Sequence, residues 1–153
     1  TTIHSFTTDQ SLHDQPHKDL RRARGASQSI VPTTTGAAKA LTKIFTHLEN
    51  KMGGCGIRVP VPDGSLTDIT FNVQRAVTIE EINAAFQLAS QTNLKGILDY
   101  TEDSIVSVDV IGNKNSCLFD AQLTSVIDKM VKVVGWYDNE IGYSSRIVDL
   151  IEG

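Results

Sequence analysis

Cysteine and long apolar runs are scarce in this chain. Its only two cysteines, Cys55 and Cys117, lie far apart and form no CxxC motif, which excludes a disulfide-rich secreted scaffold and argues against a structural zinc site. No apolar run is long enough to cross a bilayer, and the first residues show no signal-peptide pattern. We therefore expect no metal, no membrane partner and a cytoplasmic location.

Basic charge is also in short supply. Lys and Arg number 14 against 18 Asp and Glu, so the net charge is −4. General electrostatic binding to nucleic acid needs a basic face, and this balance predicts no nucleic-acid partner. The length of 153 residues and the hydrophobic content of 40% fit a globular domain with a core of its own.

The first third of the chain predicts one strand, one long loop and one helix. Residues 1–6 alternate β-branched and aromatic with smaller polar residues, as a strand does, and a chain that opens inside a strand suggests a fragment. Residues 7–29 are polar and aperiodic, and loops of such length are usually functional. Apolar residues at helical spacing between Ala37 and Leu48 predict a helix, with Thr34 or Thr35 as N-cap and a glycine C-cap.

The remainder predicts a strand-rich region with two further helices. Thr78 and Glu81 form a capping box ahead of a helix whose inner face is Ile82, Ala85, Phe86 and Ala89. A last helix is expected from about Glu140 to Ile151. Strands are expected at residues 55–59, 66–73, 97–100, 105–110, 116–119 and 130–137. The pattern indicates an α+β fold with a mostly antiparallel sheet and helices on one face.

The segment PTTTGAAKA is the most specific local signal. Backbone N–H groups at a helix start attract anions, and the hydroxyls of Thr33–Thr35 with the open backbone of Gly36 would add hydrogen bonds to a phosphate. An ordinary threonine cap is the favoured interpretation from this segment alone. The basic run of Lys18, Arg21, Arg22 and Arg24 likewise suits phosphate, but is more simply a solvated loop or a subunit contact.

Two single residues are candidates for chemistry. Arg58 lies in the apolar stretch CGIRVPVP, where a charge needs either an acidic side chain or an anionic ligand. His4 lies in the first strand and could be a general base, although a lone strand histidine is more often structural. The other three histidines, including His17, are interpreted as surface residues, and both cysteines as buried, unreactive thiols.

Asn139 and Tyr143 stand four residues apart at the start of the last predicted helix and should face the same way. They would line a pocket, or only cap and pack. From the residues alone, we expect an α+β domain that binds a phosphorylated small molecule.

Read in order, several long motifs resemble phosphorylating glyceraldehyde-3-phosphate dehydrogenases over nearly the whole chain. They are TTIHSFTTDQ, HKDLRRARGASQSIVPTTTGAAKA, IRVPVP, LKGILDYTEDSIVSVD and KMVKVVGWYDNEIGYSSRIVDL. The resemblance implies an NAD-dependent oxidoreductase of glycolysis and gluconeogenesis that converts glyceraldehyde 3-phosphate and inorganic phosphate to 1,3-bisphosphoglycerate. It also implies a homotetramer, in which residues 7–29 form an S-shaped loop that lines a neighbouring subunit's cofactor site.

The resemblance implies roles at the matching positions. His4 corresponds to the general base that activates the cysteine thiol. Thr7, Arg22 and Arg58 correspond to residues that hold the C3 phosphate of the substrate. Arg58 appears again in the pocket for inorganic phosphate, together with Thr35 and Gly36.

Asn139 corresponds to the residue that contacts the nicotinamide amide of NAD, with Tyr143 beside it. The implied organisation is a catalytic, substrate-binding domain over residues 1–138 and a C-terminal helix over 139–153 that belongs with an absent Rossmann domain. By the same resemblance, Pro16 favours NAD over NADP as the cofactor.

Three departures from the family and two alternative assignments remain. The family's Ser-Cys-Thr-Thr-Asn nucleophile motif and its glycine-rich dinucleotide fingerprint are missing from these residues, so we expect this chain alone to be inactive. VPDGSLTD also differs from the commoner PNVSVVD form, at a turn. The alternatives are erythrose-4-phosphate dehydrogenase, which the intact PTTTGAAKA motif disfavours, and a non-catalytic assembly or interaction fragment.

Overall fold

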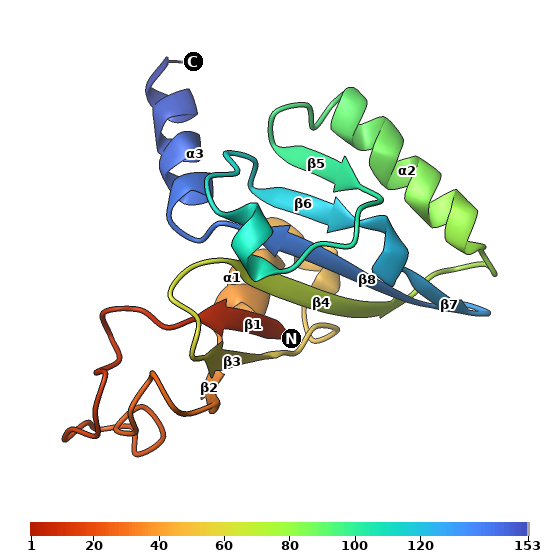
Figure 1. Ribbon diagram of the computed structural model, residues 1–153. Helices are drawn as coiled ribbons and strands as arrows, with labels where there is room; N and C mark the ends of the chain where they lie inside the picture. Colours follow the sequence, from red (N-terminus) through yellow and green to blue (C-terminus); the bar gives the residue numbers. More distant parts are fainter. Residues whose placement is uncertain (153) are drawn as a thin grey trace. The chain divides into compact units, whose positions relative to one another are not determined.

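The computed structural model describes residues 1–152, apart from the side chains of residues 38 and 39. The chain folds as two compact units, Thr1–Pro62 and Asp63–Gly153 (Figure 1). Residue 153, the last of the predicted C-terminal segment, lies outside the described residues.

The first unit is built around a central strand, β3 (Cys55–Val59). It pairs in parallel with β1 (Thr2–Ser5) and antiparallel with β2 (Val31–Thr34). The sequence did not predict β2, because its Pro32 and consecutive threonines were interpreted as a helix approach. Proline is tolerated in a strand at the edge of a sheet, where its missing N–H breaks no ladder bond.

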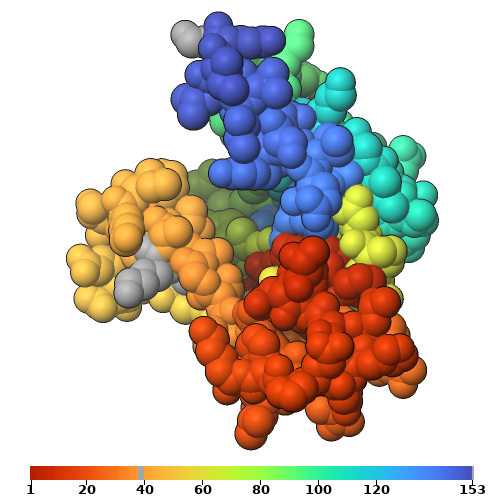
Figure 2. Space-filling model, turned by 90° about the vertical axis from the view of Figure 1, so that its left-hand side faces the viewer, coloured from red at the N-terminus to blue at the C-terminus, as the bar shows by residue number. Residues whose placement is uncertain are grey.

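Residues between β1 and β2 form no helix or strand, as predicted, but they are not loosely arranged. In the space-filling view this segment, red to orange, is a packed mass (Figure 2). The Asp14 carboxylate accepts from the Gly25 N–H at 2.7 Å and from Arg24 Nε at 3.0 Å. The Gly25 N–H, followed by Arg24, lowers the pKa of Asp14. The segment is therefore folded through its own hydrogen bonds.

The helix α1 (Ala37–Ile44) is shorter than predicted and differs at both caps. Its N-cap is Gly36, not a threonine, and its C-cap is Phe45, not a glycine. A 3₁₀ turn, η1 (Thr46–Leu48), follows. The apolar face is real but open to solvent: Ile44 is 74% exposed and Phe45 47%.

The second unit has five strands and two α-helices among its described residues. β8 (Met130–Tyr137) is the predicted strand and pairs antiparallel with β4 (Ser65–Asn72), β6 (Cys117–Asp120) and the unpredicted β7 (Ser125–Ile127). β6 also pairs in parallel with β5 (Leu98–Thr101). The mostly antiparallel α+β fold predicted from the sequence is confirmed.

The core of this unit forms where α2 (Ile79–Gln91) covers one face of the strands (Figure 1). Phe119 is 1% exposed, and its ring stacks on Phe86 with centroids 4.0 Å apart. The capping box of Thr78 and Glu81 is present as predicted. Ala85, expected on the inner face, is exposed.

The predicted strand at residues 105–110 is wrong. Ser107–Val110 is instead a 3₁₀ turn, η2, because the Asp109 carboxylate accepts a hydrogen bond from the Val106 N–H at 2.8 Å and closes the turn. A further turn, η3 (Ala121–Leu123), follows β6. Gly64, with φ of +84°, meets the η2 turn: a Cβ there would lie 2.3 Å from the Ser107 carbonyl oxygen.

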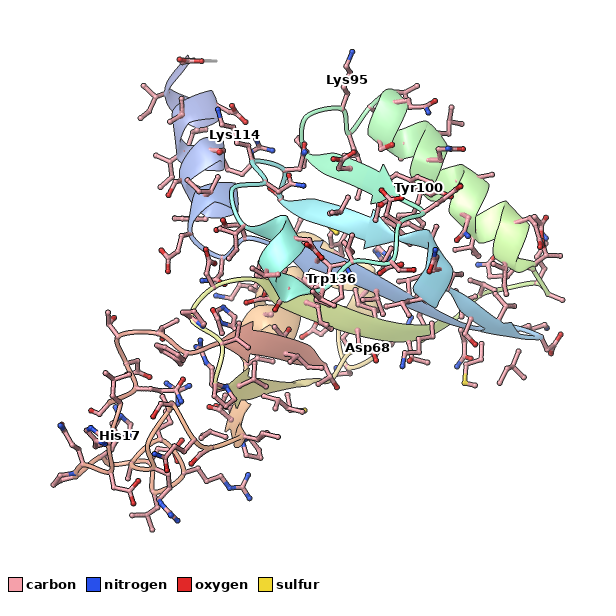
Figure 3. The ribbon with its side chains drawn as sticks, in the orientation of Figure 1. His17, Asp68, Lys95, Tyr100, Lys114 and Trp136 are labelled. Carbon is pink, nitrogen blue, oxygen red and sulfur yellow. The ribbon has the colours of Figure 1, made fainter. Side chains whose placement is uncertain are left out.

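The sole tryptophan is Trp136 on β8 (Figure 3). Its indole Nε1 donates to the buried Asp120 carboxylate at 2.9 Å. Because both residues belong to the second unit, tryptophan fluorescence reports on the folding of that unit.

The last helix, α3 (Ile141–Glu152), forms close to its predicted limits. Leu150 is 83% exposed and Ile151 79%, and the helix stands out as the dark blue column of Figure 2. Gly142, in its first turn, is buried against the Asn115 carbonyl.

Candidate active site

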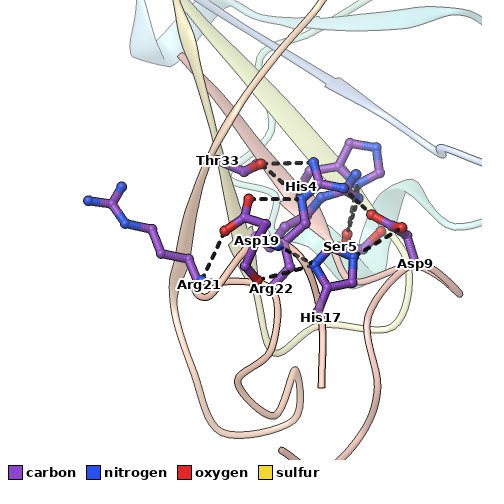
Figure 4. A network of polar contacts seen from close by, with 9 residues as sticks. His4, Ser5, Asp9, His17, Asp19, Arg21, Arg22 and Thr33 are labelled. Atoms are coloured by element: carbon purple, nitrogen blue, oxygen red, sulfur yellow. Dashed lines mark hydrogen bonds and ion pairs between the residues drawn. The ribbon is translucent and has the colours of Figure 1, made fainter. Parts of the chain in front are cut away.

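Strand pairing brings His4 and Arg58 together. The register of the parallel β1–β3 pair sets His4 opposite Arg58 and Ser5 opposite Val59. Arg58 Nη1 lies 2.8 Å from His4 Nδ1 and donates to the Ser5 carbonyl oxygen at 2.9 Å. His4 Nδ1 is itself 2.7 Å from that oxygen (Figure 4). The contacts of Arg58 thus include a ring nitrogen and a carbonyl, neither of which the sequence alternatives foresaw.

Arg22 is held by side chains of its own unit. Its Nε and Nη2 both donate to Thr33 Oγ1, at 3.1 and 2.8 Å, and Nη1 donates to the Asp9 carboxylate (Figure 4). Asp19 adds a carboxylate oxygen 3.7 Å from Nε. Since Arg22 is 23% exposed, a phosphate that binds it must share it with, or displace, Asp9.

His17, interpreted from the sequence as a surface residue, is 25% exposed and belongs to the same network. Its Nδ1 accepts from the Asp19 N–H at 2.9 Å, and its Nε2 is 4.0 Å from the Asp9 carboxylate. The sequence missed this group because Asp9, His17, Arg22 and Thr33 meet only after the loop has folded back. The Asp-x-x-Arg spacing of Asp19 and Arg22 was the one local signal available.

The helix start at PTTTG is held by a threonine side chain. The Thr35 hydroxyl accepts from the Ala37 N–H at 3.2 Å. Gly36 has ordinary helical φ and ψ, and a Cβ at this position would meet no atom within 4 Å. The side of Gly36 on which a Cβ would point is therefore open, and Thr33, two residues before Thr35, links this segment to Arg22.

Thr7 lies at the point where the chain leaves β1. Its carbonyl oxygen accepts from the Gln10 N–H at 2.8 Å, which makes a turn. The Gln10 side chain is buried, with no hydrogen-bond partner for its amide among the described residues. Thr7 is thus held half-buried at the base of the loop, close in sequence to Asp9.

Asn139 and Tyr143 belong to the second unit. Asn139 precedes α3, so the helical spacing expected for this pair does not apply. Its Oδ1 accepts from the buried Ser65 hydroxyl at 2.8 Å, which fixes the orientation of the amide. Tyr143 is 72% exposed.

Asp138, which the sequence did not single out, lies just before α3. Its buried carboxylate accepts from the N–H groups of Gly112, Glu140 and Ile141, each at 2.8 Å. Burial raises the pKa of Asp138, but the three backbone donors, together with a hydrogen bond to the Asp63 side chain, outweigh it and the net shift is downward. Asp138 therefore holds both the helix start and the backbone on which Asn139 sits.

Neither cysteine has the surroundings of a nucleophile. Cys55 is exposed, which corrects the expectation that both thiols are buried, and its sulfur lies 3.9 Å from Thr1 Oγ1. Burial raises the pKa of Cys117 to about 11, so at neutral pH it is a thiol rather than a thiolate.

Residues 1–152 show neither a membrane-spanning helix nor a cluster of metal ligands. No helix there is both long and apolar enough to span a bilayer. The side chains described there include no group of three or more His, Cys, Asp or Glu placed to hold a metal ion.

The sequence of this chain matches a known protein family over most of its length. Residues 1–139 match the family model described as glyceraldehyde 3-phosphate dehydrogenase, C-terminal domain. The chain belongs to this family. Relatives within it include glyceraldehyde-3-phosphate dehydrogenase of Streptomyces coelicolor, 57% identical over 152 residues, and glyceraldehyde-3-phosphate dehydrogenase 2 of Streptomyces avermitilis, 56% identical over 151 residues. The Mycobacterium avium enzyme of the same name is 54% identical.

These matches cover 98–99% of the chain but only 44–45% of each relative. The chain therefore spans less than half the length of the glyceraldehyde-3-phosphate dehydrogenases it matches. Within the family domain, the contact between His4 and Arg58 and the network around Arg22 bring together four residues that the resemblance and the sequence singled out: His4, Arg58, Arg22 and Thr33.

Proposed function

We propose that this chain is the catalytic, substrate-binding part of an NAD-dependent phosphorylating glyceraldehyde-3-phosphate dehydrogenase. The activity would convert glyceraldehyde 3-phosphate and inorganic phosphate to 1,3-bisphosphoglycerate. The observation that carries the proposal is the pairing of a histidine with an arginine across β1 and β3, in a chain more than half identical to enzymes of that name.

In this proposal Arg22 and Arg58 supply the charge for two phosphate groups. Arginine presents a planar fork of donors that matches phosphate oxygens, and it stays charged at any working pH. Thr7, Arg22 and Arg58 bind the C3 phosphate of the substrate. Thr35, Gly36 and Arg58 bind the attacking phosphate, which the open side of Gly36 would accommodate.

His4 acts as the general base of the reaction. It sits on a strand rather than a loop, so its ring is held by the sheet, and its Nδ1 already faces the Ser5 carbonyl. A donor bond from Nδ1 to that carbonyl leaves Nε2 to accept a proton from a thiol. The thiol itself is proposed to lie upstream of Thr1, since Cys117 is not ionised at neutral pH and Cys55 lacks an activating neighbour among its described contacts.

Asn139 fits the carboxamide of a nicotinamide, because its own amide is oriented by Ser65 and offers both a donor and an acceptor. The nicotinamide would accept the hydride when NAD is bound. Tyr143 would lie beside it, and the exposed apolar side chains of α3 would pack against the cofactor domain. Residues 1–138 would form the catalytic domain and 139–153 the docking helix.

The same proposal includes a homotetramer in the cytoplasm, with residues 7–29 at a subunit contact. The internal hydrogen bonds of this loop support the role, because a surface that contacts another subunit needs a defined conformation.

The test is a hybrid enzyme in which this chain replaces the matching part of the Streptomyces coelicolor relative. NADH formation is measured with glyceraldehyde 3-phosphate or erythrose 4-phosphate, each with and without inorganic phosphate. We expect phosphate-dependent activity that prefers glyceraldehyde 3-phosphate. His4→Ala should lower kcat by roughly 10²–10⁴-fold, the range for loss of a general base, whereas His13→Ala, in the exposed loop, should leave it unchanged.

A preference for erythrose 4-phosphate would move the assignment to the sister enzyme. A folded hybrid that is silent with both substrates would favour the assembly fragment. Residues 1–153 alone should give no turnover, and activity of that highly purified chain would refute an upstream thiol.

A further inference from the structure

The charges around Arg22 oppose an entering anion. Asp9, His17, Asp19 and Arg22 form a group within the loop between β1 and β2, which we call the Arg22 cluster (Figure 4). The Asp9 carboxylate accepts a hydrogen bond from Arg22 Nη1, and an Asp19 carboxylate oxygen lies 3.7 Å from Nε. Two carboxylates thus face one guanidinium, so the cluster has a net charge of −1 as long as His17 is neutral. A phosphate that approaches this cluster meets repulsion as well as a donor.

Asp9 is the partner of Arg22 that a phosphate would replace. Nε and Nη2 of Arg22 donate to the Thr33 hydroxyl, which is neutral and does not repel an anion. Nη1 donates to the Asp9 carboxylate, whose charge does repel one. The Asp9 side chain is 51% exposed, against 23% for Arg22. Because water screens an ion pair with such an exposed partner, the pair contributes little and Asp9 can leave Arg22 at small cost.

His17 offers Asp9 a second partner. One oxygen of the Asp9 carboxylate binds Arg22, and the other lies 4.0 Å from His17 Nε2. The Nδ1 atom of His17 lies 2.9 Å from the Asp19 amide nitrogen and 3.1 Å from the Asp19 carbonyl oxygen. Protonation of the ring exchanges the first of these hydrogen bonds for the second, within the same residue. Histidine is the side chain that ordinarily gains its charge between about pH 5 and pH 8.

We propose that His17 makes anion binding at Arg22 proton-dependent: the protonated ring pairs with Asp9, and an oxyanion takes the place of Asp9 on the guanidinium. This inference rests on the proposed function, since it concerns the regulation of the same phosphate site. With His17 charged, the Arg22 cluster is neutral, so an entering anion meets no net negative charge. Because linkage is reciprocal, a bound anion also favours the protonated ring.

The other cations of the loop do not neutralise the cluster directly. Lys18 and Arg21 are exposed, and neither forms an ion pair with a carboxylate of the cluster among the described residues. Arg21 contacts Asp19 through its backbone N–H, at 2.9 Å. Arg24 is paired with Asp14 at 3.0 Å. The histidine ring is therefore the group in contact with the cluster carboxylates whose charge changes near neutral pH.

The experiment measures sulfate binding to this chain by NMR at about pH 5.5 and about pH 8, at constant ionic strength. Sulfate is the probe because its charge does not change in this range, whereas that of phosphate does. The Arg22 Nε–H resonance reports binding, and the His17 ring resonances report protonation on the same sample. We expect sulfate to bind roughly five- to tenfold more tightly at the lower pH, the low end for coupled sites, because the half-exposed Asp9 is screened. The midpoint pH of the His17 titration should rise when sulfate is bound.

Two variants separate His17 from other titrating groups. His17→Gln keeps a hydrogen-bonding side chain that cannot gain charge, so sulfate should bind Arg22 at both pH values as weakly as it binds the unsubstituted chain at pH 8. Asp9→Asn removes the competing carboxylate, so binding should be tight at both values. The matched controls are His13→Gln, in the exposed part of the loop, and Glu49→Gln, an exposed carboxylate of the same unit. Both controls should keep the pH dependence of the unsubstituted chain.

The outcomes separate this inference from the function on which it rests. Sulfate binding at Arg22 that is equally tight at both pH values would overturn the proton dependence and leave the anion site standing. A pH dependence that persists in a folded His17→Gln chain would overturn it as well. Absence of any sulfate response of Arg22 at either pH would count against both proposals. The comparison of the two pH values in the unsubstituted chain needs no variant to fold.

Discussion

Replacing Asp138 by alanine should loosen the start of α3 and destabilise the second unit. The carboxylate accepts three backbone hydrogen bonds at 2.8 Å. Two come from the N–H groups of Glu140 and Ile141 at the N-terminal end of α3, and one comes from Gly112. Loss of an N-cap side chain costs about 1 kcal/mol. Losing the hydrogen bond that the carboxylate accepts from the Gly112 N–H adds about 1–3 kcal/mol. The expected loss is therefore about 2–4 kcal/mol in the free energy of unfolding.

Urea unfolding followed by Trp136 fluorescence measures this loss in the correct unit. For a chain of this size the thermal midpoint should fall by roughly 4–16 °C. Hydrogen exchange should accelerate at residues 140–152, and Asn139 should lose its fixed orientation. The stability of Asp138→Asn should fall between that of the unsubstituted chain and that of Asp138→Ala. The asparagine oxygen still accepts a hydrogen bond, but its NH₂ group faces another backbone N–H.

The matched control is Asp149→Ala on the same helix. Asp149 is 58% exposed and pairs with Arg146 over one turn, an interaction of about 0–1 kcal/mol. If Asp138→Ala and Asp149→Ala show the same midpoint and the same exchange at residues 140–152, the account of Asp138 as a buried cap is refuted.

Three further outcomes are expected. Gly135→Ala should destabilise by about 1–3 kcal/mol, because its Cβ would lie 2.5 Å from the Cys117 sulfur; urea unfolding checks this, and Cys117→Ala in the same chain should restore part of the loss. Because the pKa of Asp138 is lowered on folding, its contribution to the free energy of unfolding is complete above the pKa of the unfolded carboxyl, about 3.9. That contribution is lost as the pH falls through the pKa of the folded state. An acid-unfolding curve that is unchanged in Asp138→Asn would contradict this. Iodoacetamide at pH 8 should alkylate exposed Cys55 and spare Cys117 until the chain unfolds, as judged by mass spectrometry, whereas equal labelling would show that burial does not protect the second thiol.

Elements with strong local signals were predicted well. Thr78 and Glu81 satisfy one another's backbone groups within four residues, so their capping box can be read without any tertiary contact. β8 was predicted because its apolar run is long and β-branched. In both cases local preference and the final fold agree.

Elements that depend on distant partners were missed. β2 is a strand because β3 pairs with it, and its short sequence of proline and threonines does not predict that pairing. Residues 105–110 have strand-like composition, yet Asp109 closes them into a turn. Element type there is decided by a single side-chain hydrogen bond rather than by periodicity.

The candidate site divides in the same way. The need of Arg58 for a partner follows from its apolar surroundings and could be predicted. That His4 and the Ser5 carbonyl are among its partners depends on the register of β1 against β3, which the sequence does not display. The engagement of Arg22 by Asp9 and Thr33 likewise depends on how the loop folds back.

The loop between β1 and β2 also bears on the thermodynamics of association. Its Asp14 carboxylate holds Gly25, the Ala26 N–H donates to the Ser11 carbonyl, and the Gln15 N–H donates to the Ala23 carbonyl. A flexible loop pays about 0.5–1.5 kcal/mol for each side chain that a partner immobilises. A loop already ordered by these bonds has met most of that entropic cost during folding, so a surface that docks on it can bind tightly through comparatively few contacts.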